Sequence, residues 1–147
     1  MTEKNAGFSL LELIIVIVIL GALTVTAVSR FANDDSYRLR IIQEDIISAL
    51  TQAQQLAMAG QPVQFTAASG APSLYSVRLG APLADYSVAG VSFPQEVDAA
   101  ISIAPLPLTI NYDVIGRPDV TPTLVLTTTA GDSVSVCISA TGLAYGC

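Results

Sequence analysis

The sequence predicts an α+β protein in which one long N-terminal helix packs on an antiparallel β-sheet head. Two patterns carry this prediction. Residues 8–59 follow helical spacing, first with apolar side chains all round and then with an apolar stripe on one side. Residues 61–147 change to short stretches of alternating apolar and polar side chains, separated by Gly, Pro and Ser, which is typical of antiparallel strands.

The chain begins with a short polar leader, residues 1–7, and an apolar run over residues 8–28. At about 1.5 Å per residue this run forms a helix roughly 31 Å long, which matches the hydrocarbon core of a bilayer. We therefore expect residues 8–30 to form a membrane-spanning helix. A secretory signal peptide fits less well, because its apolar core has only about 7–15 residues. A plain single-span anchor fits the length, whereas a buried core helix does not fit so long an apolar run.

Glu12 is the informative residue of this run. A carboxylate within the membrane costs about 2.5–3.5 kcal/mol on insertion scales, and a plain anchor gains nothing from it. An acid in this position therefore predicts a function and requires a cationic partner. If the chain is cut after Gly7, the new amine of Phe8 lies one helical turn from Glu12. The amine of an adjacent subunit could then neutralise Glu12 inside a filament.

Residues 36–59 continue as an amphipathic helix, the second half of the long helix. The capping residues Asn33 to Ser36 predict a local flexing or a restart near residue 34. Gly60 and Pro62 predict the end of the helix. The apolar stripe contains Leu39, Ile42, Ile46, Leu50, Ala53 and Ala57.

Residues 61–147 are expected to form the β-rich part of the head. Strand patterns centre on Phe65, Val77 and Ile110. Residues 123–129 and 133–139 flank Ala130-Gly131-Asp132, which predicts a hairpin. Residues 66–73 and 81–107 are rich in Ala, Pro, Ser and Gly, and we expect loops with short edge strands there.

The composition argues against several classes of function. The chain has no His, no Gly-rich phosphate loop and no C-x-x-C, so we expect no enzyme, no zinc site and no cofactor. The net charge of −6 falls entirely on residues 41–147, and this negative charge argues against binding of nucleic acid. The scattered acids, Asp113 and Asp119 among them, lack the spacing of a calcium loop and are interpreted as solvated surface. The alternative is that Asp113 and Asp119 contribute to a calcium or partner site.

Cys137 and Cys147 are the two cysteines of the chain. An even number, in a chain with an export-like segment, favours an oxidising compartment and one disulfide. Closing a loop of about ten residues would stabilise the fold by roughly 2–3 kcal/mol on the loop-entropy model. A structural staple is the favoured role, because no third cysteine or His is available for redox or metal chemistry.

The segment Gly7-Phe8-Ser9-Leu10-Leu11-Glu12-Leu13, with the apolar residues that follow to Gly21, resembles the type IV pilin signature. The resemblance implies that a prepilin peptidase removes residues 1–7 on the cytoplasmic side and methylates the amine of Phe8. It implies that Glu12 sets the register of assembly, and that residues 8–28 hold the subunit in the inner membrane. Residues 31–147 would form a periplasmic, pilin-like head until an inner-membrane assembly platform moves the subunit into a filament at the cell surface.

The same resemblance leaves several filament systems open. Ser29 stands where major pilins usually carry Pro before a pair such as Arg30-Phe31, which favours a minor pilin. Residues 43–65 and 112–118 resemble H-type minor pseudopilins, and the loop between the cysteines resembles the mannose-sensitive haemagglutinin pilus group. We expect a minor pilin that primes or builds a pilus of that group, with other pilin subunits as partners. The alternatives are an H-type minor pseudopilin of type II secretion and a binding module that captures DNA or a host surface.

Overall fold

The computed structural model describes residues 10–31, 34–70, 72–88 and 90–147. The chain divides into two compact units, residues 1–34 and residues 35–147. We call them the stalk and the head. Each is described by itself below.

The described part of the stalk is the helix α1 (Leu10–Phe31). Glu12 lies in its first turn, where the helix dipole favours a negative charge. The predicted helix over residues 8–30 is therefore observed from Leu10 onward, while Gly7, Phe8 and the rest of the leader lie outside the described residues.

The second helix, α2 (Asp34–Met58), corresponds to the predicted amphipathic helix over residues 36–59. It begins at Asp34, inside the predicted cluster of capping residues. It ends in a hydrogen-bonded turn in which Gly60 N donates to Ala57 O and Gln61 N donates to Leu56 O. Gly60 has φ +81°, a conformation that glycine adopts without a steric penalty, so the predicted stop is confirmed.

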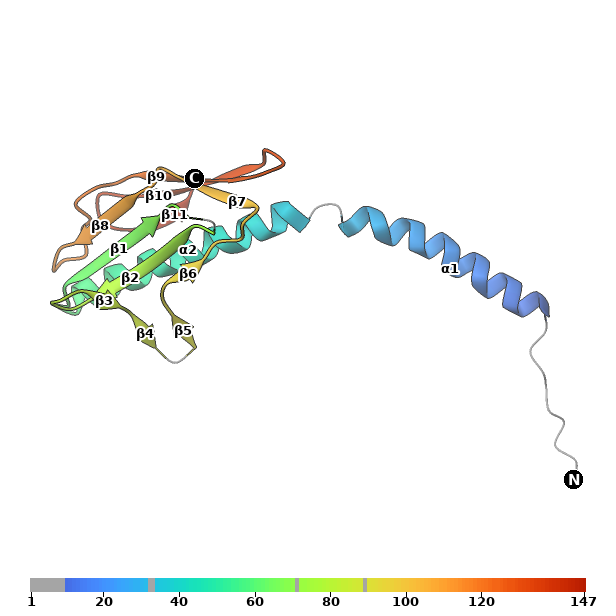
Figure 1. Ribbon diagram of the computed structural model, residues 1–147, viewed down its shortest axis with the longest axis horizontal. Coiled ribbons are helices and arrows are strands. Elements are labelled where there is room, and N and C mark those ends of the chain that lie inside the picture. Colours follow the sequence, from blue (N-terminus) through green and yellow to red (C-terminus); the bar gives the residue numbers. More distant parts are fainter. Residues whose placement is uncertain (1–9, 32–33, 71, 89) are drawn as a thin grey trace, which may run out of the picture. The chain divides into compact units, whose positions relative to one another are not determined.

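One face of α2 forms the centre of the head's core. The predicted stripe is buried except at Ile42, which is half-buried, and Gln43 and Ala49 join it. The fully buried members include Leu39, Ile46 and Leu50. Figure 1 shows α2 running along the head beside β1 and β2.

The described strands form two main antiparallel sheets and one small one. The first sheet has the order β3-β2-β1-β8, and β6 also pairs with β2. Its strands are β1 (Val63–Ala68), β2 (Leu74–Leu79), β3 (Ala84–Asp85), β6 (Gln95–Glu96) and β8 (Leu108–Tyr112). Phe65 in the central strand pairs with Val77 on one side and Ile110 on the other, so the three predicted strand centres lie in one row.

The second sheet has the order β11-β10-β9-β7. Its strands are β7 (Ile101–Ala104), β9 (Thr123–Thr128), β10 (Ser133–Ile138) and β11 (Ala144–Gly146). The predicted hairpin is confirmed, because β9 and β10 pair in register from Thr127 opposite Ser133. The small sheet joins β4 (Ser87–Val88) to β5 (Val91–Ser92).

The structure bears out the α+β class and corrects two details of the prediction. The head was expected to hold a single sheet, but its strands form two main sheets that share one apolar core with α2. Alternation along a strand shows which face is buried, yet it does not show which strands pair, so this division could not be read from the sequence. Part of the expected loop over residues 66–73 is strand, because β1 stays paired with β2 as far as Ala68 opposite Leu74.

Candidate functional site

The first candidate site is the apolar surface of α1. Every side chain described on residues 10–23 is exposed in the single chain. Most of them are Leu, Ile or Val, with exposed fractions between 44 and 75%. Soluble monomers rarely expose a continuous apolar surface of this kind, so it marks a contact with other chains or with lipid.

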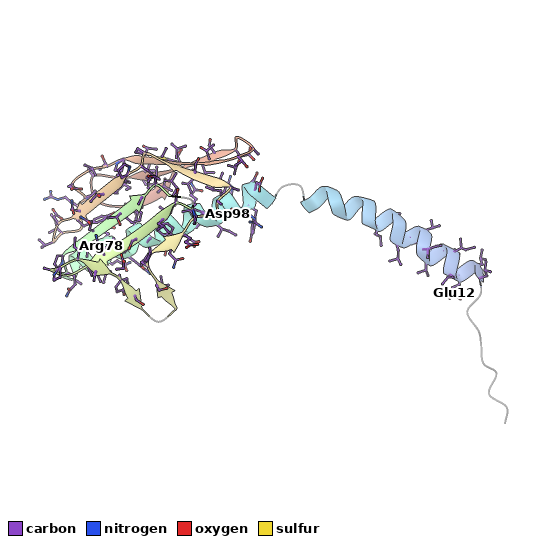
Figure 2. The ribbon with its side chains drawn as sticks, in the orientation of Figure 1. Glu12, Arg78 and Asp98 are labelled. Carbon is purple, nitrogen blue, oxygen red and sulfur yellow. A yellow bond between two sulfur atoms is a disulfide. The ribbon has the colours of Figure 1, made fainter. Side chains whose placement is uncertain are left out.

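Glu12 is the single charged residue within residues 10–23. It lies in the first turn of α1, and its side chain is exposed among the apolar residues (Figure 2). The arrangement places a negatively charged hydrogen-bond acceptor among the apolar side chains of residues 10–23. The predicted cationic partner, the amine of Phe8, lies outside the described residues, so that pairing stays a prediction.

Among the described residues, no helix meets the combined requirement of length and apolarity for crossing a membrane.

The second candidate site is the disulfide of the head. Cys137 and Cys147 are joined, with Cα atoms 5.8 Å apart. Cys137 lies on β10 and pairs with Tyr145 of β11, and Cys147 N donates to Ser135 O immediately beyond β11. The disulfide therefore closes the end of the three-residue edge strand onto β10, as expected of a structural staple.

Two glutamines of α2 that the sequence analysis did not single out hold this region in place. Gln43 is 7% exposed, and its Nε2 donates to Ser135 O at 2.7 Å. Gln54 Nε2 donates to Gly116 O at 3.3 Å and to Thr141 O at 2.8 Å. The spacing of Gln43 from Leu39 and Ile46 was a usable signal, because it places a polar side chain on the buried stripe.

The loops that meet at Gln54 depend on a glycine. Gly142 has φ +92°, and a Cβ at this position would overlap the Gly116 carbonyl oxygen and the Gln54 side chain. The turn between β10 and β11 can therefore approach the loop after β8 closely. The C-terminal part of α2 is thus tied to the loop after β8 of the first sheet and to the turn between β10 and β11 of the second.

The carboxylates of the loop after β8 serve the fold. Asp113 Oδ1 accepts hydrogen bonds from Ile115 N and Arg117 N at 3.0 and 2.8 Å, and its Oδ2 accepts one from Arg117 Nε. The hydrogen bond from the Arg117 backbone is the main reason that the pKa of Asp113 lies below its usual value. Asp119 accepts hydrogen bonds from Asn111 N and Nδ2 at 2.9 and 2.7 Å.

These contacts agree with the interpretation of Asp113 and Asp119 as surface carboxylates. Within the described ranges, no three His, Cys, Asp or Glu side chains are grouped so that they could hold a metal ion.

Among the described residues of the head, three ion pairs tie arginines to acids at the surface. Arg38 contacts Asp98 at 2.7 Å, Arg78 contacts Asp85 at 3.7 Å, and Arg117 contacts Asp113 at 3.2 Å. Asp98 also accepts a hydrogen bond from Ala100 N, and this bond, followed by that from Arg38, lowers its pKa. Exposed pairs of this kind contribute little to stability, so they act mainly in holding loops in position.

The comparison with known protein families bears on the N-terminal segment. Residues 3–28 match the prokaryotic N-terminal methylation motif. The match covers Gly7, Phe8 and Glu12, and it supports the resemblance to type IV pilin-like proteins. Searches of curated proteins and of solved structures find no match to the chain.

Proposed function

We propose that the chain is a minor type IV pilin, a non-enzymatic subunit that primes or builds a pilus of the mannose-sensitive haemagglutinin type. The observation that carries the proposal is the match to the methylation motif over residues 3–28. The exposed apolar surface of α1, with Glu12 as its one charge among residues 10–23, supports it.

The proposed mechanism combines the processing steps that the methylation motif implies with the chemistry of the apolar surface of α1. A prepilin peptidase cuts after Gly7 and methylates the amine of Phe8. Residues 8–28 first hold the subunit in the inner membrane, with the head in the periplasm. Burial of the apolar side chains against other subunits then drives assembly, and Glu12 pairs with the N-terminal amine of a neighbour. The pair offsets the cost of burying either charge alone, so it favours one register between helices.

The mass of the N-terminal peptide from native membranes tests the processing step. We expect a chain that starts at Phe8 and carries one methyl group on its amine. A chain that starts at Met1, or that is cut within or beyond residues 8–28, would instead indicate a plain anchor or an exported domain. The assembly role of Glu12 would then be abandoned.

The second candidate function is an H-type minor pseudopilin of type II secretion. It is favoured by the order of elements in the head, in which α2 is followed by the turn at Gly60 and then by β1. The resemblance of residues 43–65 to H-type minor pseudopilins depends on this order of elements. Deletion of the gene separates the two candidates. Loss of surface pili with normal exoprotein secretion supports the pilin, and loss of secretion with intact pili supports the pseudopilin.

A further inference from the structure

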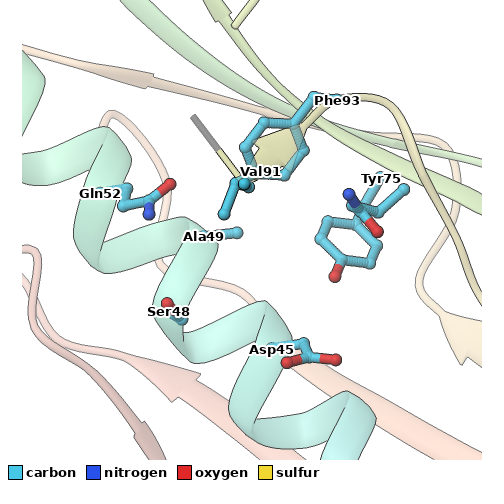
Figure 3. Close-up of a pocket in the computed structure, with 9 residues that line it drawn as sticks. Asp45, Ser48, Ala49, Gln52, Tyr75, Val91 and Phe93 are labelled. Atoms are coloured by element: carbon cyan, nitrogen blue, oxygen red, sulfur yellow. The ribbon is translucent and has the colours of Figure 1, made fainter. Parts of the chain in front are cut away.

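A polar groove of about 220 Å³ in the head plays no part in the assembly steps described above. Asp45, Ser48, Ala49 and Gln52 line it from α2 (Figure 3). Their spacing of three and four residues puts them on one side of the helix. The other wall contains Tyr75, Gly90, Val91, Phe93 and Gln95.

The groove presents hydrogen-bond acceptors that lack a donor. Gln52 Oε1 is buried and has no hydrogen-bond partner among the described residues. Asp45 lies two turns earlier on α2, is exposed, and forms no ion pair with any part of the chain that the structure describes. A buried acceptor without a donor destabilises the site, and a ligand that supplies N–H groups would remove this penalty.

The aromatic wall suits a ligand with an aliphatic part and a cationic end. Tyr75 and Phe93 are 6 and 9% exposed, and their rings meet edge to face with centroids 6.1 Å apart. The Tyr75 hydroxyl points toward Asp45 (Figure 3). Aromatic rings pack well against the methylene groups of Lys and Arg side chains and attract their charged ends.

The described head does not itself provide the cation. Arg38, Arg78 and Arg117 are paired with other acids. Arg40 lies at a different groove, together with Glu44 and Gly146. A positive charge for Asp45 must therefore come from outside the described head.

We propose that this groove binds one basic side chain, an alkylammonium or guanidinium group, of a partner polypeptide. The Asp45 carboxylate accepts the N–H groups of the charged end, and Tyr75 and Phe93 flank the aliphatic stem. Gln52 Oε1, two turns further along α2, accepts a main-chain N–H group of the partner. The view that the partner is another subunit of the same filament rests on the proposed function. The binding chemistry itself does not.

An NMR titration of the purified full-length chain in detergent micelles tests the proposal. The probes are N-acetyl-arginine amide, N-acetyl-lysine amide and the uncharged analogue N-acetyl-citrulline amide. We expect saturable shifts at the Gln52 side-chain amide and at Ala49 with the two cationic probes, and no saturable shift with citrulline. Asp45→Asn should weaken the apparent affinity about tenfold, because it removes a charge-assisted hydrogen bond.

Glu44→Gln is the matched control, because it makes the same change of charge at the neighbouring exposed position, outside the groove. It should bind the probes as the unchanged chain does. Equal weakening by both variants would reveal a general charge effect and overturn the proposal. So would the absence of saturable shifts, or equal binding of citrulline and arginine. N-terminal processing plays no part in this titration, so its outcome is independent of the test of the proposed function.

Discussion

At the scale of single residues, polar side chains in the head differ in whether the chain itself satisfies them. Asp113 accepts three hydrogen bonds within its own loop, and Gln43 reaches a strand carbonyl from α2. The hydroxyl of Tyr112 is buried and has no hydrogen-bond partner within the described part of the chain. Buried groups without a partner are destabilising, so Tyr112 is a place where a substitution should stabilise the head.

We predict that Tyr112→Phe stabilises the head by about 1 kcal/mol near neutral pH, because it removes a buried hydroxyl without a partner. Tyr145→Phe is the control, since Tyr145 is 45% exposed and should change stability little. Urea unfolding of both variants measures the difference. A destabilised Tyr112→Phe variant would show that the hydroxyl has a partner in solution.

The same residue predicts a loss of stability at high pH. Burial, and then the negative charge of Asp119, raise the pKa of Tyr112 from 10.0 to about 12. Above pH 10 the tyrosine of the unfolded chain loses its proton first, so the free energy of unfolding falls as pH rises from 10 toward 12. Tyr112→Phe should reduce this fall, as measured by urea unfolding at pH 8 and pH 11.

Glu12→Ala tests the charge on α1. The variant should still enter the membrane and be cleaved, because loss of the acid makes insertion more favourable by about 2.5–3.5 kcal/mol. Its incorporation into filaments should fall at least about fivefold, which corresponds to a loss of about 1 kcal/mol in pairing with the neighbour's amine. Immunoblots of sheared filaments and membranes measure both quantities, with Glu44→Gln as the control. Normal incorporation would remove the amine-pairing argument.

At the scale of elements, α2 organises the head because both main sheets share its buried face. Gln43 connects this helix to β10, and Gln54 connects it to the loops after β8 and β10. The short edge strand β11 is held by its pairing with β10 and by the disulfide. The stability of the C-terminal region should therefore depend on these few contacts.

Gln43→Met should destabilise the head by about 1 kcal/mol, because it keeps the side-chain length but removes the donor to Ser135 O. The effect is limited, since Ser135 O also accepts a hydrogen bond from Cys147 N. Gln55→Met serves as the control, as Gln55 is exposed on the same helix. Equal denaturant midpoints for the two variants would show that the Gln43 hydrogen bond contributes nothing.

Replacing both Cys137 and Cys147 by Ser should lower the free energy of unfolding by roughly 2–3 kcal/mol, the value expected for closing a loop of about ten residues. Urea unfolding with and without a reducing agent measures it. Reduction should destabilise the unchanged chain to the same extent and leave the double variant unaffected. A double variant as stable as the oxidised chain would contradict the role of a staple.

At the scale of the whole molecule, the chain combines an apolar helix with an acidic head. The net charge of −6 lies within residues 41–147, where Arg78 and Arg117 are the basic residues. Both of these arginines are paired with acids. This distribution favours contacts with proteins through apolar and hydrogen-bonding surfaces over contacts with phosphate groups.

We predict that the purified full-length chain does not bind duplex DNA at about 0.15 M salt, because non-specific DNA binding depends on neutralising phosphates with basic side chains. Fluorescence anisotropy of a labelled duplex measures this, with titrations at lower salt as the comparison. Saturable binding at the higher salt would contradict the charge argument and revive the DNA-capturing binding module as a function.

The sequence by itself determined the two helices, the central strands, the β9–β10 hairpin and the disulfide. Each depends on local patterns, such as helical periodicity, the stop at Gly60, alternation around Phe65, or a pair of cysteines that has no other partner. It also determined the candidate role of Glu12, because a lone acid in an apolar run is conspicuous without any coordinates.

The tertiary structure alone decided the division into two sheets, the contacts of Gln43 and Gln54, and the groove beside Asp45. These features join residues far apart in the chain: Gln43 meets Ser135, and Asp45 faces Tyr75. Strand pairing and side-chain contacts over such distances depend on how the whole core packs, and a local pattern of residue types does not encode that packing.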